Sequence, residues 1–273
     1  MKVKKGISAF LVVYNEEKVI ERCLKSLVGV VDEIIVIHDG LCDDKTLEIA
    51  KKYTKKVRQL EHKGMGELYV IEAIQMAQFS WILRMDADEF LSDDLRNNIR
   101  NLIKNDSIDA YTFIWKIWNG KKYISEKFPF KKSFCRKENS YFIEFPGMEL
   151  ETRGVTKSTE YVLEHMPLYN NYTLRMVQRK WRRWAKVHAE YYVFKKIRSY
   201  NCPKETLDFF LEKIQRQTKF AYLIACPFWF LYSFLKSFFV RKYFRNIKTW
   251  KVAFFQGFYG WYLCYFISKE KRK

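Results

Sequence analysis

Apolar runs of strand character alternate with amphipathic stretches along the first hundred residues. The runs recur about every 25 residues and are rich in β-branched and aromatic residues, as in Ile7–Val13, Asp32–His38, Val57–Leu60 and Trp81–Met85. The stretches between them repeat apolar residues at the helical period, and Asn15 offers an N-cap for the first helix. This order predicts an α/β fold with a mainly parallel sheet and right-handed crossovers.

Polar side chains follow each of the four expected strands. They are Tyr14 with Glu16, then Asp39, then Lys63 beside a glycine, and finally Asp86 with Asp88. Ligands in parallel sheets bind beyond the carboxyl ends of the strands, so we expect these side chains to share a site. Together they could hold a base, a ribose, a diphosphate and a cation. The sequence contains no P-loop, and its Gly-Met-Gly run lacks the third glycine of a dinucleotide fingerprint.

Carboxylates cluster directly after the fourth expected strand, at Asp86, Asp88 and Glu89. Mg²⁺ and Mn²⁺ prefer oxygen ligands, usually one or two carboxylates together with substrate phosphates. Acidic clusters after strands are often only solvated, and taken alone this one slightly favours that interpretation. Its position beside the other strand ends favours a metal site instead.

The stretch Ile7–Asp94 resembles the nucleotide-sugar half of a family 2 glycosyltransferase with the GT-A fold. That family shows a strand, Tyr-Asn-Glu, a second strand ending in an Asp-Gly turn, and a strand leading into Asp-x-Asp. The segments RCLKSLVGVVDEIIVIHDG and WILRMDADEFLS are similar, more narrowly, to the lipopolysaccharide core glucosyltransferase-like branch. Two departures stand out: His38 replaces an acidic residue of the turn, and the basic residue usual after the third strand is missing from Leu68–Ile71.

The resemblance implies a role for each strand-end residue. Tyr14 and Glu16 would flank the base, and Asp39 would hydrogen-bond the base or the ribose. Asp86 and Asp88 would handle the sugar and a Mg²⁺ or Mn²⁺ ion, with Asp88 as the principal metal ligand. The donor would be a nucleotide-diphosphate sugar, most naturally a UDP-hexose.

The middle of the chain supplies the candidate general base. Enzymes of this family invert at the anomeric carbon, so a carboxylate must remove the proton of the attacking acceptor hydroxyl. The related branch has a glutamate soon after a Pro/Gly turn, which points to Glu149 here, with Glu151 as the alternative. An ordinary strand-edge salt bridge remains open for either residue. His165 resembles a histidine of the same branch, but a lone histidine beside a loop is more often structural.

The charge balance points to anionic partners. Lys and Arg number 50 against 31 Asp and Glu, a formal charge of +19, and aromatic residues make up 18% of the chain. The aromatic residues crowd the last fifty positions, which favours a membrane interface over a nucleic-acid groove. Six widely spaced cysteines without a Cys-x-x-Cys pair favour a reducing compartment. We therefore expect a location on the cytoplasmic side of a membrane.

The last hundred residues predict helices that associate with a membrane surface. Residues 173–198 read as one long basic helix, whose Lys180 and Arg183 could neutralise a diphosphate or form a solvated face. Phe220–Leu235 and Val252–Ser268 are uncharged for 16 and 17 residues, whereas a spanning helix needs about 20. Such segments would lie in the interface plane of an anionic membrane. Two tilted spans, or aromatic helices packed on the catalytic domain, remain alternatives.

These features predict a catalytic GT-A domain at residues 1–172, with a nucleotide-sugar half at 1–105 and an acceptor half at 106–172, followed by a helical region at 173–273. The expected activity is inverting transfer of a hexose to a glycolipid or lipid-linked acceptor, with no nucleic-acid partner. Two other classes stay open. One is a metal-dependent nuclease or nucleotidyltransferase that uses the acidic cluster, and the other is a noncatalytic membrane scaffold with the same fold.

Overall fold

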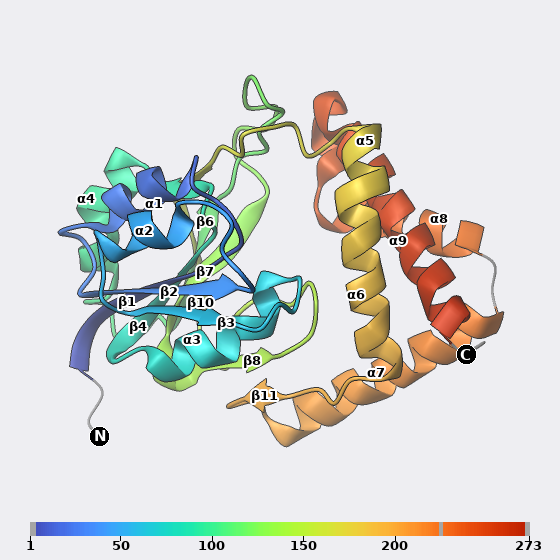
Figure 1. The fold of residues 1–273 in the computed structure, drawn as a ribbon, viewed down its shortest axis with the longest axis horizontal. Helices are drawn as coiled ribbons and strands as arrows, with labels where there is room; N and C mark the ends of the chain where they lie inside the picture. Colours follow the sequence, from blue (N-terminus) through green and yellow to red (C-terminus); the bar gives the residue numbers. More distant parts are fainter. Residues whose placement is uncertain (1–3, 224–225, 271–273) are drawn as a thin grey trace.

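A mixed eight-stranded sheet forms the centre of the N-terminal α/β part in the computed structural model, which describes residues 4–223 and 226–270 (Figure 1). Its strand order is β3-β2-β1-β4-β7-β6-β10-β5. The strands are β1 (Lys4–Val13), β2 (Glu33–Asp39), β3 (Val57–Leu60), β4 (Phe79–Met85), β5 (Glu89–Leu91), β6 (Ala110–Ile114), β7 (Phe130–Arg136) and β10 (Thr156–His165). Strands β1 to β4 are mutually parallel, and β7 runs antiparallel to β4 and β6. The predicted α/β fold with a mainly parallel sheet is confirmed.

Helices cover both faces of this sheet, which is why its first strands are continuous apolar runs. On one face lie α1 (Ile20–Leu27), α2 (Thr46–Lys51) and α4 (Asp93–Leu102), and on the other lie the 3-10 turn η1 (Gly66–Tyr69) and α3 (Val70–Met76) (Figure 1). Side chains alternate between the two cores along β2, because Ile34 and Val36 face one core while Ile35 and Ile37 face the other. A second sheet pairs β8 (Ser140–Ile143) with β9 (Glu151–Thr152) and β11 (Ser199–Tyr200), and the turn η2 (Lys137–Asn139) precedes it.

Strand register brings the polar strand ends together. Strand β1 lies between β2 and β4, with Val13 opposite His38 and Leu11 opposite Met85. The residues that follow β1 therefore stand between the end of β2 and the acidic segment after β4. This register is what positions the candidate site.

The C-terminal helices pack against the α/β part. They are α5 (Leu174–Met176), the π-helical turn η3 (Val177–Trp181), α6 (Arg182–Val193), α7 (Lys204–Leu223), α8 (Cys226–Val240), η4 (Tyr243–Arg245), η5 (Ile247–Thr249) and α9 (Trp250–Glu270). One shared core joins Phe145 to Tyr191 and Ile214, and another joins Ile117 to Val252. Some of the aromatic side chains therefore pack the helices against the α/β part. None of the helices within the described ranges is both long and apolar enough to cross a membrane.

Two local expectations are wrong. The helix expected over residues 173–198 ends at Val193, because the chain then enters β11, where Arg198 forms ion pairs with Glu144 and Glu72. Asn15 does not cap α1, which begins at Ile20. Its backbone is left-handed with φ of 51°, and its side chain bonds to Asp43 instead.

The predicted domain boundary at residue 172 falls in the loop between β10 and α5. Ile224 and Ala225 of the predicted segment Phe220–Leu235 lie outside the described residues.

Glycines allow α8 and α9 to approach closely. A Cβ added at Gly260 would lie 2.6 Å from the carbonyl oxygen of Trp229, and one at Gly257 would lie 2.7 Å from the ring of Phe230. The first contact is with backbone, which a rotamer change cannot relieve. These glycines therefore mark the contact between the two helices.

Replacing Gly260 by alanine should separate α8 from α9. We expect a loss of about 2 kcal/mol in unfolding free energy, because inserted carbon atoms in a close-packed contact force the backbone apart. Gly66→Ala is the matched control, since its Cβ would meet Val12 at an ordinary 3.5 Å. Urea denaturation of both variants measures the difference, and equal stabilities would refute the close contact.

Candidate functional site

The predicted nucleotide-side residues Tyr14 and Asp39 meet at one corner of the sheet. The ring of Tyr14 lies 5.0 Å from that of His62. Asp39 is buried and accepts hydrogen bonds from the backbone N–H groups of Lys63 and Gly64, at 2.6 and 2.8 Å. A hollow of about 480 Å³ opens beside them, lined by Gly40, Leu41, Gln59, Leu60, Glu61 and His62. The hollow is thus lined by His62, which contacts the ring of Tyr14 and lies 3.5 Å from the carboxylate of Asp39.

The side chain of Lys63 points away from this hollow. Its ammonium donates to the carbonyl of Leu68 at 2.8 Å and lies over the ring of Tyr69. It also lies 3.8 Å from both Glu72 and Glu144. The ammonium of Lys63 is thus engaged within the protein, and its predicted contact with a diphosphate stays a prediction.

His38, the departure from the family pattern, holds the turn after β2. Its Nδ1 lies 2.9 Å from the carbonyl oxygen of Gly40, and its Nε2 accepts from the backbone N–H of Asn15 at 3.3 Å. Both contacts fit a neutral imidazole that carries its proton on Nδ1. The histidine thus ties the end of β2 to the segment after β1.

Glu16 lies beside the acidic cluster, although the resemblance implied a place next to the base. Its backbone N–H donates to Thr46 Oγ1 at 2.6 Å. Burial, and after it the negative charges of Asp88 and Asp86, raise the pKa of Glu16 to about 7, while Lys180 acts in the opposite direction. The pKa of this carboxyl group is therefore near neutrality mainly because the group is buried, with a smaller contribution from its acidic neighbours.

Asp86 and Glu89 share a partly buried lysine, Lys131, from β7. Glu89 is fully buried and accepts from the backbone N–H of Asp86 at 2.8 Å, from Trp115 Nε1 at 2.6 Å and from Lys131 at 2.5 Å. Lys131 also donates to Asp86 at 2.7 Å. Burial acts to raise the pKa of Asp86, but the cations of Lys131 and Arg84 outweigh it and hold that pKa well below its usual range. Asp86 is therefore ionised, whereas Glu89 serves to hold the turn.

Asp88 faces a histidine that the sequence analysis left outside the predicted site. Its carboxylate lies 3.5 Å from Nε2 of His165, which is buried and stacks on Trp115 at 4.0 Å between ring centroids. Nδ1 of His165 is buried without a hydrogen-bond partner in the structure. A carboxylate and an imidazole are suitable donors for a divalent cation. Within residues 4–223 and 226–270 no three acidic, histidine or cysteine side chains are grouped to hold a metal.

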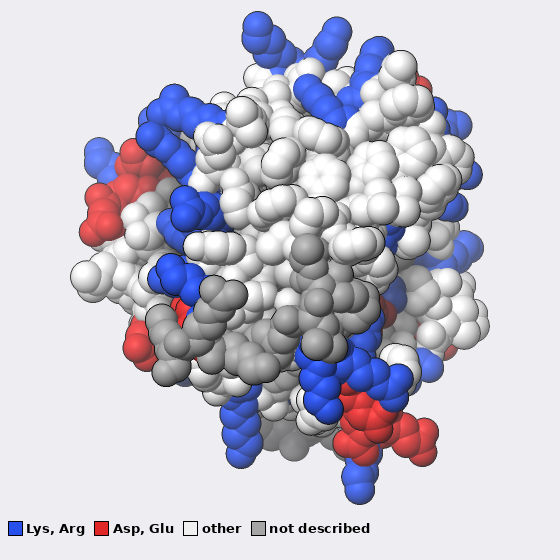
Figure 2. All heavy atoms as spheres, turned by 90° about the vertical axis from the view of Figure 1, so that its right-hand side faces the viewer, with Lys and Arg blue, Asp and Glu red and all other residues white. Residues whose placement is uncertain are grey.

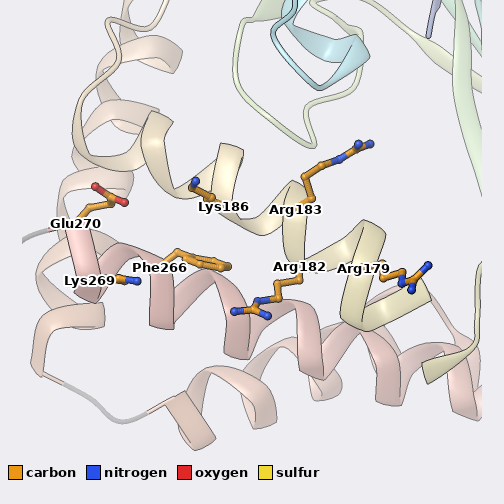
Figure 3. Close-up of a pocket in the computed structure, with 7 residues that line it drawn as sticks. All are labelled: Arg179, Arg182, Arg183, Lys186, Phe266, Lys269 and Glu270. Carbon is orange, nitrogen blue, oxygen red and sulfur yellow. The ribbon is translucent and has the colours of Figure 1, made fainter. Parts of the chain in front are cut away.

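The helical region contributes positive charge to this edge of the sheet. Lys180 donates to Asn171 at 3.3 Å and lies over the rings of Tyr169 and Trp184. Burial lowers its pKa, while Asp88 and Glu16 act in the opposite direction. Arg183, one turn along, points from α6 toward the loops of the α/β part (Figure 3). Lys180 and Arg183 therefore add positive charge on the side of the helical region that faces the α/β part.

The two candidate bases have different surroundings. Glu151, in β9, forms an ion pair with Lys132, which is the strand-edge role left open for it. Glu149 is exposed and follows Met148, whose carbonyl accepts from Arg84 at 3.1 Å. Arg84 lies on β4, two residues before Asp86. Its hydrogen bond to Met148 therefore holds the segment of Glu149 near the acidic cluster of Asp86 and Asp88.

Comparison with known proteins gives consistent matches. The chain matches the family described as "Glycosyl transferase family 2" over residues 8–170. An uncharacterized glycosyltransferase of Rickettsia bellii is 37% identical over 108 residues, which cover 39% of this chain and 36% of that relative. Poly-beta-1,6-N-acetyl-D-glucosamine synthase of Staphylococcus epidermidis is 31% identical over 115 residues, covering 39% and 28%. The matched segment thus spans about a third of these relatives' length.

A solved structure shares the fold. It is that of S. aureus TarS 1–349 in complex with UDP-GlcNAc, with a TM-score of 0.50 and 14% sequence identity. The superposition covers 97% of this chain and 91% of that one. At this identity the match shows the fold alone.

Replacing Glu16 by glutamine tests the electrostatics of the cluster. A folded-state pKa raised from 4.5 to about 7 means that a stabilising contribution is complete below pH 4.5 and is lost as pH rises through 7. Glutamine stays neutral, so we expect the variant to be about 2 kcal/mol more stable than wild type near pH 8, with a smaller gain near pH 5. Urea denaturation at both pH values gives the measurement. Glu48→Gln on the exposed side of α2 is the control, and an equal response of the two variants would contradict the assignment.

Proposed function

The chain belongs to glycosyl transferase family 2, and from that premise we propose that it transfers a hexose from a UDP-sugar to a hydroxyl group of a lipid-linked or lipopolysaccharide-type acceptor. The transfer would invert the anomeric carbon and take place at the cytoplasmic face of a membrane. The observation that carries the proposal is the meeting of Tyr14, Asp39 and the Asp86/Asp88 cluster at one edge of an α/β GT-A-like sheet. The narrower likeness to lipopolysaccharide core glucosyltransferases belongs to this proposal.

The donor would lie across the strand ends. The uracil would occupy the hollow beside Tyr14, with Asp39 within reach of the base or the ribose. The diphosphate would run toward Asp88, where Lys180 and Arg183 supply positive charge from the helical region. Support for this orientation comes from the position of the hollow at the β2 and β3 ends and of the cations at the β4 end.

Asp88 and His165 would hold a Mg²⁺ or Mn²⁺ ion, with Asp86 close by. The fit rests on the Asp88 carboxylate, which faces Nε2 of His165 at 3.5 Å. When bound, such an ion neutralises the charge that develops on the leaving diphosphate. Lys131 already balances Asp86 and Glu89, so the added cation would mainly meet Asp88 and the substrate.

In the transfer step the acceptor oxygen forms a bond to the anomeric carbon as the bond from that carbon to the diphosphate oxygen breaks. Glu149 would take the proton of the attacking hydroxyl. Its exposure leaves it accessible to an acceptor, whereas Glu151 is occupied by Lys132. Lys180 and Arg183 would hold the departing UDP.

The alternative classes fit the structure less well. A nuclease or nucleotidyltransferase would use Asp86, Asp88 and Glu89 together as ligands, but Glu89 is fully buried and occupied by three donors. The scaffold interpretation rested partly on His38, whose two hydrogen bonds show it filling the structural role of the turn. Both observations favour the transferase.

Asp88→Asn tests the metal-side half of the proposal. We expect the rate of UDP release from UDP-sugars to fall about 100-fold or more. The neutral amide would hold the divalent cation less tightly, and the charge on the leaving diphosphate would be less well stabilised. Asp93→Asn, an exposed carboxylate in the first turn of α4, should keep full activity. A wild-type rate and an unchanged Mn²⁺ dependence in Asp88→Asn would exclude this residue from the site.

Glu149→Gln tests the general base. Removal of a positioned base commonly costs about 100-fold to 10,000-fold, so we expect kcat to fall by that order while the KM for the donor stays nearly unchanged. Glu151→Gln should lower the rate much less, since its carboxylate serves an ion pair. Initial-rate kinetics of both variants decide between them, and the reverse ranking would move the base to Glu151.

A further inference from the structure

The outer side of α8, η5 and α9 carries an apolar surface that the protein itself leaves uncovered. Exposed large side chains on it include Phe228, Leu231, Phe239, Ile247, Phe254 and Trp261, with exposed fractions from 38% for Trp261 to 73% for Ile247. We call this set the apolar face. Figure 2 shows it as a broad area without charged side chains.

The apolar face is not a by-product of core packing. On α8, Phe228, Leu231, Leu235 and Phe239 recur at helical spacing along one exposed stripe, while the buried Trp229 faces inward. On α9 the exposed stripe includes Phe254 and Trp261, while Val252, Leu263 and Cys264 face inward. Both helices are therefore apolar on the side that faces solvent as well as on the side that packs. Continuous exposed patches of this kind mark interaction surfaces.

Positive charge surrounds the apolar face. Residues 226–269 contain seven Lys and Arg and no Asp or Glu. Figure 2 shows blue side chains along much of the margin of the uncharged area, with red ones beside them at the left and lower right. The matching partner is a surface that is apolar inside and negatively charged at its boundary.

A basic hollow extends this margin toward α6. It measures about 450 Å³, and Arg182, Lys186 and Lys269 line it together with Phe266 (Figure 3). Arg182 lies over the Phe266 ring at 6.0 Å. Arg179, Arg183 and the carboxylate of Glu270 complete the lining, which is therefore mainly basic. Such a hollow suits the phosphate of a lipid headgroup.

We propose that the apolar face docks on an anionic lipid bilayer, with α8 and α9 lying in the plane of the interface. The exposed Trp, Tyr and Phe side chains would enter the headgroup region, where aromatic residues are favoured, and the basic margin would meet anionic phosphates. A second copy of this chain is a poorer occupant, because it would bring an equally uncompensated positive margin. This inference goes beyond sugar transfer and does not depend on it.

Docking would also orient the candidate site. Lys180, whose charge acts on Asp88 and Glu16, lies in η3, and α6 continues from that turn with Arg182, Arg183 and Lys186, which line the basic hollow. One helix thus connects the proposed lipid surface with the proposed diphosphate site. An acceptor held in the membrane would reach the strand ends along this helix.

Vesicle co-sedimentation of the full chain tests the apolar contribution. We expect binding to vesicles of phosphatidylcholine mixed with phosphatidylglycerol, and weaker binding to phosphatidylcholine alone or at high salt. The double variant Phe228→Ser with Ile247→Ser should bind the mixed vesicles about tenfold more weakly. The matched control, Val28→Ser with Val155→Ser, changes two exposed residues of the α/β part and should bind like wild type.

The charge contribution has its own pair of variants. Arg245→Glu with Lys248→Glu should weaken binding to the mixed vesicles about tenfold or more, whereas Lys51→Glu with Lys121→Glu, exposed on the α/β part, should weaken it much less. Quenching of tryptophan fluorescence by brominated lipids gives a second reading on the unmodified chain, since Trp250 and Trp261 would enter the interface. Absence of vesicle binding, absence of quenching, or equal binding by face and control variants would overturn the proposal. So would light scattering that shows a dimer abolished by Phe228→Ser with Ile247→Ser.

Discussion

The crowding of carboxylates at the end of β4 is the constraint on which the rest of this structure depends. The charges of Asp86 and Asp88 raise the pKa of Glu16, and Glu89 is fully buried next to them. Buried negative charges are tolerated only when they are paired. Lys131 supplies that pairing from β7, and this is why a hairpin far along the chain must close against the fourth strand. The same crowding leaves Asp88 attracted to any further cation.

Positive charge from the C-terminal helices lies close to the carboxylates at the end of β4. This charge links the helical region to the α/β part. Lys180 is drawn toward Asp88 and Glu16 although burial disfavours its charge. The helices are held in place by shared cores such as that of Phe145 with Tyr191. The catalytic edge and the apolar face of α8 and α9 are therefore parts of one packed unit. Proposed chemistry and proposed membrane contact meet at α6.

Most of the parallel sheet could be predicted because its strands are buried on both faces and bounded by polar turns. The convergence of Tyr14, Asp39 and Asp86 followed from the same pattern. Contacts between distant segments could not be predicted in this way. Lys131 is one of many lysines in the sequence, and only tertiary folding places its ammonium between Asp86 and Glu89. The facing of His165 and Asp88 likewise depends on β10 pairing with β5, and the end of α6 depends on the ion pairs of Arg198.

The central claim is that the strand ends form a nucleotide-sugar site whose diphosphate end takes a divalent cation. Thermal unfolding of the full chain with UDP-, GDP- and CMP-sugars, each with and without Mn²⁺, tests it most directly, because a ligand that binds only the folded state raises the melting temperature by an amount that grows as its concentration exceeds its Kd. The account predicts a rise with a UDP-hexose that is larger in the presence of Mn²⁺ and is lost in Asp88→Asn. No rise with any nucleotide sugar, or a rise that Mn²⁺ and Asp88→Asn leave unchanged, would contradict it.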